Sequence, residues 1–152
     1  MVKILGHWDI GHHAPITEQY YWFFGVRDFG ITDWNMAPVS GIRNREHEVK
    51  LTEWDCYDSY FDANPDCVRV FVEPRTRHEN PETVWLHDFE HPENCTYVFG
   101  AVGYNPTKRY RRDSDHLITV KTEQDKGVMW ACQIMPIVLY DRMMKNGCYS
   151  NR

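Results

Sequence analysis

Apolar and polar positions along the chain form blocks that predict strands and helices in turn. Five short runs rich in β-branched and aromatic residues predict strands, at residues 2–6, 31–39, 68–74, 95–100 and 116–122. Three longer segments place apolar residues at helical spacing, in part or throughout, at residues 17–30, 52–64 and 128–147. Residues 86–94 indicate a short acidic helix or turn. This alternation predicts an α/β fold with a mostly parallel sheet and helices on both faces.

Two of the helical segments carry clear boundary signals. In residues 52–64, Trp54, Tyr57 and Tyr60 recur on one face, and Pro65 follows the segment. The segment of residues 128–147 is the longest and ends at Gly147, a residue typical of helix C-termini. It contains Pro136, which removes a backbone hydrogen bond and is expected to kink or split the helix.

Composition narrows the class of protein. A chain of 152 residues with 42% hydrophobic residues predicts a single domain, residues 1–152, with a full core. The formal net charge of −5 argues against strong nonspecific binding to nucleic acid, although a local basic patch remains compatible with it. The five cysteines include no CxxC pair, and no apolar run is long enough to span a membrane. We therefore expect a cytoplasmic protein with free thiols and no membrane association.

The stretch TYVFGAVGYNP, residues 96–106, starts as a buried strand and continues into a loop with two glycines. Two interpretations are open. The stretch is either an ordinary turn, since small glycine-containing loops are common, or a loop that holds a ligand against the backbone at the end of a strand.

Two further groups of residues invite a functional interpretation. The segment KRYRR places Lys108, Arg109, Arg111 and Arg112 around a tyrosine, which suits contacts to phosphates and bases of RNA. It is equally interpretable as a solvated loop balanced by neighbouring aspartates. His7, His12 and His13 match no standard metal-ligand spacing, so we expect no metal site.

The order of the segments VRVFVEP, LHDFEHPENCTYVFG, HLITVKT and GVMWACQIMPIVLYDRM resembles that of the SPOUT methyltransferases, specifically the SpoU branch. The upstream stretch HHAPITEQYYWFFGVRDFGI is similar to the first motif of that family. The resemblance covers nearly the whole chain. It implies a trefoil knot in the C-terminal part, a homodimer that pairs through the first and last helices, and S-adenosylmethionine bound in the knot. It also implies an RNA substrate, most often a ribose 2′-hydroxyl of tRNA or rRNA.

The resemblance also implies which residues hold the cofactor. They lie at the ends of three predicted strands and at the start of the last helix: Val72, Glu73, Phe99, Gly100, Ala101, Gly103, Ile118, Val120, Gly127, Val128 and Met129. Most of these residues are small or apolar, so we expect the backbone to provide most of the contacts.

Several polar residues of the family motifs are replaced in this chain. Ala101 and Val102 stand where the family has Pro and Glu, and Trp130 stands about where it has Asn. The Asn and Arg positions of the first motif fall on Glu18 and Phe24, with Arg27 one turn further along the same helix. Cofactor binding is therefore better supported than the family's usual reaction.

Glu18 and Arg27 are the ionisable residues closest to the family's catalytic positions, and we take them as candidate catalytic residues. The alternative is that Glu18 is an acid favoured at a helix N-terminus and that Arg27 is an exposed side chain.

Three functions remain open at this point. The first is an S-adenosylmethionine-dependent methyltransferase acting on RNA. The second is a catalytically inactive knotted homodimer that binds S-adenosylmethionine or RNA without methyl transfer, which the missing motif residues favour. The third is an enzyme that uses the same cofactor on an acceptor other than RNA.

Overall fold

The structure is a computed structural model of the chain. It describes residues 1–9, 16–40, 49–73, 80–101, 104–123 and 129–147. Twelve elements follow one another in the order β1 (Val2–Asp9), α1 (Ile16–Asp28), β2 (Asp33–Ser40), β3 (Leu51–Glu53), α2 (Tyr57–Ala63), β4 (Arg69–Glu73), β5 (Val84–Trp85), the 3₁₀ helix η2 (Leu86–Asp88), β6 (Cys95–Phe99), α3 (Thr107–Tyr110), β7 (His116–Thr119) and α4 (Ala131–Lys145).

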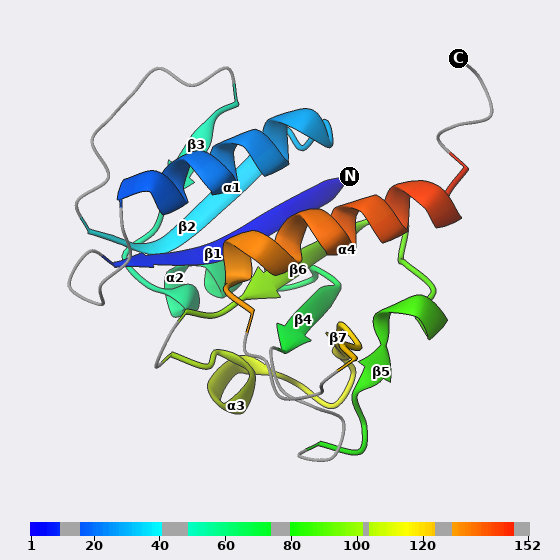
Figure 1. Cartoon of the computed structure of the whole chain (residues 1–152). Coiled ribbons are helices and arrows are strands. Elements are labelled where there is room, and N and C mark those ends of the chain that lie inside the picture. Colours follow the sequence, from blue (N-terminus) through cyan, green and yellow to red (C-terminus); the bar gives the residue numbers. More distant parts are fainter. Residues whose placement is uncertain (10–15, 41–48, 74–79, 102–103, 124–128, 148–152) are drawn as a thin grey trace.

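The seven strands form one sheet in the order β3-β2-β1-β6-β4-β7-β5, and every pairing is parallel (Figure 1). The expected α/β class is thus confirmed. Because the strands are parallel, all their carboxyl ends lie at one edge of the sheet and all their amino ends at the opposite edge. Strand β6 lies between β1 and β4, so the strand that ends in the glycine loop is central.

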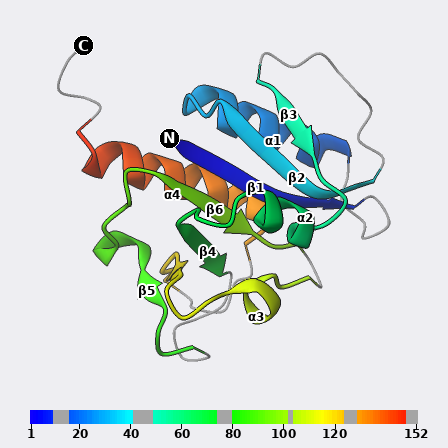
Figure 2. The ribbon, with the colours of Figure 1, turned by 180° about the vertical axis from the view of Figure 1, so that it is seen from behind.

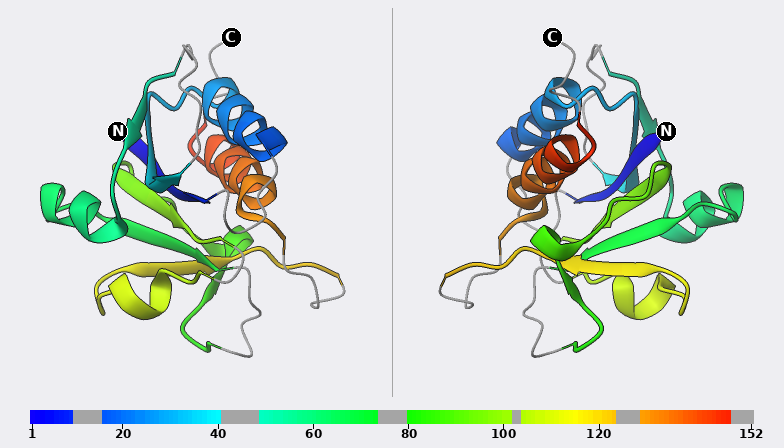
Figure 3. Two further views of the ribbon diagram at one scale, coloured as in Figure 1. Left: turned by 90° about the vertical axis from the view of Figure 1, so that its left-hand side faces the viewer. Right: turned by 90° about the vertical axis from the view of Figure 1, so that its right-hand side faces the viewer.

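Helices cover both faces of the sheet, as Figures 2 and 3 show. Helices α1 and α4 lie side by side on one face, and a core there includes the fully buried Trp22, Trp34 and Met135. Helices α2 and α3 lie on the other face, over a smaller core that includes Tyr57 and Phe71. Successive residues of a strand face opposite sides, so Val72 belongs to the first core and Phe71 to the second.

Helices α1 and α4 approach each other closely at Gly25. A Cβ atom at this position would lie 2.4 Å from Met135 Cε, so the small residue allows the two helices to pack. Trp22, one turn earlier on α1, makes an edge contact with Phe99 of β6 at a centroid distance of 5.5 Å. The position of α1 and α4 on the sheet is therefore set by large buried side chains.

A polar cluster, which we call the clasp, joins the C-terminal half of α4 to residues 86–97. His91 Nε2 donates to Asp141 Oδ2 at 2.8 Å, and His91 Nδ1 then accepts from the Tyr97 hydroxyl at 2.6 Å. Arg142 donates to the carbonyls of Pro92 and Glu93. Lys145 Nζ donates to the carbonyl of Leu86 at 2.7 Å and to that of Phe89 at 3.1 Å. The clasp lies toward the edge where the strands begin.

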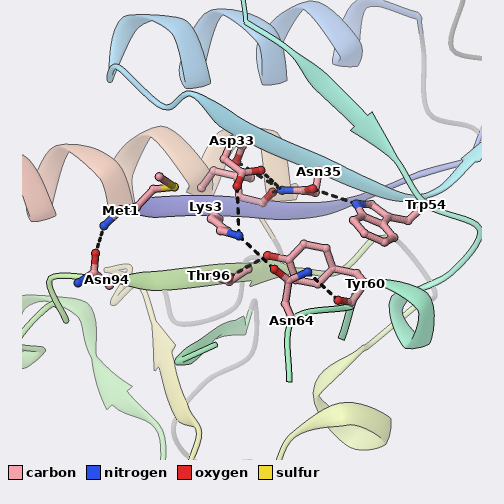
Figure 4. A network of polar contacts seen from close by, with 10 residues as sticks. Met1, Lys3, Asp33, Asn35, Trp54, Tyr60, Asn64, Asn94 and Thr96 are labelled. Carbon is pink, nitrogen blue, oxygen red and sulfur yellow. Dashed lines mark hydrogen bonds and ion pairs between the residues drawn. The ribbon is translucent and has the colours of Figure 1, made fainter. Parts of the chain in front are cut away.

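A second polar network crosses the sheet on the α2 side (Figure 4). Lys3 Nζ lies 3.3 Å from Asp33 Oδ2 and donates to Asn64 Oδ1 at 3.1 Å. The buried Asn35 accepts from Trp54 Nε1 at 2.9 Å and donates to Asp33 Oδ1 at 2.8 Å. These groups pair with one another and tie β1, β2 and α2 together, which is a structural role.

The sequence patterns were wrong in detail at three places. Val84–Trp85, expected to lie in a loop, pairs with β7 as the strand β5. Residues 52–64 do not form one helix, because Leu51–Glu53 pairs with β2 as the edge strand β3 and the helix α2 begins at Tyr57. The segment KRYRR was expected to be a loop, but its first part lies in the short helix α3. Pro136 lies inside α4, which continues past it from Ala131 to Lys145, so the helix is not split.

Candidate functional site

The carboxyl ends of β6, β4 and β7 lie next to one another in the centre of the sheet. Val72 of β4 pairs with Phe99 of β6 on one side and with Ile118 of β7 on the other. The side chains of these three residues are packed into the core under α4 and are at most 6% exposed. Among the expected cofactor residues, these three therefore come together, and they present backbone groups at the edge of the sheet.

Gly100 begins the loop that follows β6, and the loop folds back tightly on it. A Cβ atom at Gly100 would lie 2.5 Å from the carbonyl oxygen of Tyr104 and 2.8 Å from Cδ of Pro106. Ala101 and Tyr104 exchange two backbone hydrogen bonds of 3.0 and 2.9 Å. The Tyr57 hydroxyl donates to the carbonyl of Phe99 just before the loop. Gly103 and Val102 lie outside the described residues.

The last residue of β4, Glu73, is an acid that is only 7% exposed. Its Oε2 accepts from Asn105 Nδ2 at 3.3 Å, and its backbone carbonyl accepts from Thr119 Oγ1 at 2.8 Å. Asn105 is itself oriented, because its Oδ1 accepts from the backbone N–H of Thr107 at 2.9 Å. The loop after β6 and the end of β4 are thus joined by side chains.

The start of α4 lies at the same edge of the sheet. Val120 and Met129 pack, partly buried, against the core between the sheet and α4. The side chain of Gln133 accepts from the Trp130 N–H at 2.9 Å, and the Trp130 side chain is 41% exposed. Gly127 and Val128, which were also expected to hold the cofactor, lie outside the described residues.

Glu18 lies near the N-terminus of α1, at the edge where the strands end, and is 9% exposed. Burial raises the pKa of the Glu18 carboxyl, and the nearby Trp22 indole lowers it by less. The pKa of the Cys132 thiol is raised to about 11, mainly by burial and next by the charge of Glu18. Glu18 therefore lies beside the first turn of α4, where Cys132 is located. Glu18 is therefore a buried acid between two helix starts, where a raised pKa suits proton transfer.

Arg27 lies at the opposite end of α1 from Glu18. Nine residues of helix separate the two, which corresponds to roughly 13 Å. Arg27 is exposed, pairs with the adjacent Asp28 at 2.7 Å and lies over the rings of Phe23 and Phe24. The structure thus does not bring the two candidate catalytic residues together within one chain.

The cations of the segment KRYRR differ sharply in their surroundings. Arg112 donates to both carboxylate oxygens of Asp115, whose side chain is 1% exposed, and to the carbonyls of Pro65 and Cys67. Arg111 pairs with Glu82 at 2.7 Å. These two arginines hold the segment in place.

Lys108, Arg109 and Arg112 are the exposed members of the segment, but Arg112 is held by the buried Asp115. Arg109 pairs with Asp58 of α2 at 3.2 Å, with both side chains at least half exposed. Such a pair contributes little to stability, so Arg109 can exchange its partner for a phosphate at small cost. Of the four cations expected to contact RNA, Lys108 and Arg109 have the surroundings that such a contact requires.

Of the three histidines near the N-terminus, His7 has a structural role. The ring of His7 is buried, stacks on Tyr104 at a centroid distance of 4.7 Å and hydrogen bonds to the carbonyl of Ala37 at 3.2 Å. His12 and His13 lie outside the described residues. Within the described part of the chain, no group of three or more His, Cys, Asp or Glu residues is arranged to hold a metal ion.

Sequence patterns did not indicate Tyr57, Tyr104 or Asn105 as site residues. All three act through contacts between segments distant in the chain, and only the Asn-Pro step after the second glycine hinted that the loop ends there. The four cysteines in the described residues are free thiols, as expected. No helix in the described ranges is long and apolar enough to cross a membrane.

No protein-family model matches the sequence, and neither does any curated protein. Solved structures do match. The TrmH/SpoU tRNA modifying enzyme of A. aeolicus has 12% identity and a TM-score of 0.71 over 98% of this chain and 78% of its own. The chain has the SpoU/TrmH fold. A structure concerning 2-OH methylation of C/U34 on tRNA shares this fold at 11% identity and a TM-score of 0.68, over 96% of this chain and 97% of its own.

A third structure with the SpoU/TrmH fold is an AdoMet-bound rRNA methyltransferase from Sinorhizobium meliloti. It has 7% identity and a TM-score of 0.67, over 95% of this chain and 56% of its own. The resemblance to the SPOUT family that the segment order indicated is thus confirmed at the level of the fold.

Proposed function

We propose that the chain is an S-adenosylmethionine-dependent methyltransferase that acts on RNA. The observation that carries the proposal is the meeting of three strand ends, β6, β4 and β7, with the tight loop at Gly100, in a fold shared with RNA methyltransferases. A tRNA or rRNA substrate and a ribose 2′-hydroxyl acceptor are part of this proposal.

The described residues fit the cofactor. Gly100 lets the loop after β6 fold back closely on the strand end, because a side chain there would collide with Tyr104 and Pro106. In this proposal, the backbone of the loop forms one wall of the cofactor site. The neighbouring side chains of Val72, Phe99 and Ile118 are packed in the core under α4, so they would hold the three strand ends in place while backbone groups contact the cofactor. Gly103, Gly127 and Val128 complete the proposed pocket on the strength of the resemblance alone.

The bound cofactor would supply an electrophilic methyl group. The chain would then mainly hold the two reactants in line, which alone accounts for large rate accelerations when the geometry is close. Glu18 is the proposed proton acceptor for a hydroxyl nucleophile, because burial raises its pKa above that of a surface glutamate. Arg27 contributes to the reaction only if a second chain brings it to the site.

RNA would be contacted by Lys108 and Arg109, whose side chains are exposed on α3. Arg111 and Arg112 would act indirectly by fixing that segment. The net charge of −5 argues against strong nonspecific attraction to phosphates, so RNA binding would depend on these local contacts.

The homodimer expected from the resemblance is also part of the proposal. Large apolar side chains are exposed on α1 and α4, namely Tyr21, Phe24, Ile137, Tyr140 and Met144. The last three recur at spacings of three and four residues, so they form a stripe along α4. An exposed stripe of this kind is typical of a subunit interface. A trefoil knot in the C-terminal part completes the proposed architecture.

One pair of measurements tests the function. We expect calorimetric titration with S-adenosylmethionine to give saturable binding, and we expect the purified protein to transfer radiolabelled methyl groups to unmodified total RNA. Absence of binding at high micromolar cofactor would refute the proposal. Binding without transfer to RNA would favour the inactive binding protein, and transfer to another acceptor would leave RNA as the wrong substrate class.

A further inference from the structure

Glu73 is a buried acid whose carboxylate has no cationic partner among the described residues. It is a glutamate at the end of the central strand β4, and it is 7% exposed. Across the described ranges, no lysine, arginine or histidine forms an ion pair with its carboxylate. Buried acids in proteins are usually paired with a cation, so this carboxylate is a candidate to receive one from a ligand.

The carboxylate is nevertheless held in place. Asn105 Nδ2 donates to its Oε2 at 3.3 Å, and the amide of Asn105 is fixed by the N–H of Thr107. Thr119 donates to the Glu73 carbonyl, which fixes the strand end. An oriented buried acid at the carboxyl edge of a parallel sheet is placed where ligands of such sheets bind.

We infer that Glu73 is the anionic group of the proposed cofactor pocket and pairs with a cationic part of S-adenosylmethionine. The inference rests on the proposed function and deepens it by assigning the charge recognition to one side chain. The cofactor carries two positive groups, its sulfonium and its α-ammonium, and either could pair with this carboxylate, which has no cationic partner among the described residues.

The experiment compares ligands that differ in charge. The wild-type chain and Glu73→Gln are titrated calorimetrically with S-adenosylmethionine, with S-adenosylhomocysteine, which lacks the sulfonium, and with 5′-methylthioadenosine, which lacks both cations. Glu90→Gln, at an exposed position before β6, is the matched control. Urea denaturation of each variant reports whether the fold is retained.

We expect Glu73→Gln to weaken S-adenosylmethionine binding by about ten- to a hundredfold, as for the loss of a charge-assisted contact. We expect the affinity for 5′-methylthioadenosine to stay within about twofold, and Glu90→Gln to behave as the wild type. A parallel loss for S-adenosylhomocysteine would assign the contact to the ammonium, and an unchanged affinity for it would assign the contact to the sulfonium.

Three results would overturn the inference. The first is an unchanged affinity of Glu73→Gln for S-adenosylmethionine. The second is an equal loss for 5′-methylthioadenosine, which would assign Glu73 to the adenosine or to packing. The third concerns Glu73→Asp, which keeps the charge: a loss as large as that of Glu73→Gln would indicate a packing effect. Failure of the wild-type chain to bind S-adenosylmethionine would instead refute the proposed function, and the inference with it.

Discussion

Replacing Gly100 by alanine tests the geometry of the loop after β6. The added Cβ would lie 2.5 Å from Tyr104 O, which is about 0.9 Å short of the 3.4 Å at which ordinary contact begins. Neither Tyr104 O nor the ring of Pro106 can move by a change of rotamer, because both are fixed to the backbone. The loop must therefore shift, and the two hydrogen bonds between Ala101 and Tyr104 must lengthen.

The magnitude follows from these contacts. Overpacking typically costs about 1–3 kcal/mol, and two weakened hydrogen bonds add up to about 1 kcal/mol each. Alanine also makes the unfolded chain less flexible than glycine does, which stabilises the folded state by about 0.5 kcal/mol. We therefore expect Gly100→Ala to lower the free energy of unfolding by about 2–4 kcal/mol, and to weaken S-adenosylmethionine binding because the loop forms the proposed pocket.

Urea denaturation monitored by tryptophan fluorescence measures the first effect, with the slope against denaturant concentration expected to stay unchanged. The control is Gly30→Ala, which meets nothing within 4 Å but has a φ of 68°. Its cost is conformational alone, about 1–2 kcal/mol, and it should leave cofactor binding intact. The reasoning fails if Gly100→Ala is as stable as the wild type, or if it costs less than Gly30→Ala.

Three further predictions concern other parts of the molecule. Burial lowers the pKa of His91 below 6.5 despite Asp141, so its neutral hydrogen bonds stabilise the fold fully above pH 6.5 and less as the pH falls below it. His91→Asn should cost about 1–3 kcal/mol at pH 7.5 and less at pH 5.5 by urea denaturation; a pH-independent difference would contradict this. Arg112→Ala should lower the free energy of unfolding by about 2 kcal/mol or more, because it leaves the buried Asp115 without its partner. Lys108→Ala should change the free energy of unfolding by no more than about 0.5 kcal/mol, and should instead weaken RNA binding in a filter assay. Tyr140→Glu, at a side chain 51% exposed, should convert a dimer to a monomer in analytical ultracentrifugation and lower the urea midpoint, because the dimer contacts no longer stabilise the native state. An unchanged sedimentation coefficient would count against the proposed interface.

The main elements of the fold were predictable because their side chains repeat with a local period. The strands β4 and β6 are buried at every position, so their apolar runs stand out in the sequence. Strand β3 was missed because it has only three residues at the sheet edge, and what defines it is its pairing with Trp34–Met36 of β2. A pairing between segments distant in the chain leaves no local period to detect.

In the candidate site, the residues at strand ends were predictable, but most contacts between their side chains were not. Phe99 and Ile118 were placed correctly at adjacent strand ends, since strand ends follow from strands. The contact of Asn105 with Glu73 could not be inferred, because the two residues are 32 positions apart in the chain. Balance of KRYRR by neighbouring aspartates was one of the two interpretations, and the pair of Arg112 with Asp115 agrees with it. The count of cations in KRYRR therefore suggested a larger binding surface than the structure leaves exposed.

The clasp around His91 has a consequence for how the chain changes over evolutionary time. It anchors the C-terminal half of α4 at the edge where the strands begin, away from the loops at the opposite edge. Substitutions among those loops consequently leave the anchor untouched, and their cost to the fold is confined to crowded positions such as Gly100. Such a division is compatible with replaced motif residues in a fold that solved structures share at 12% identity or less.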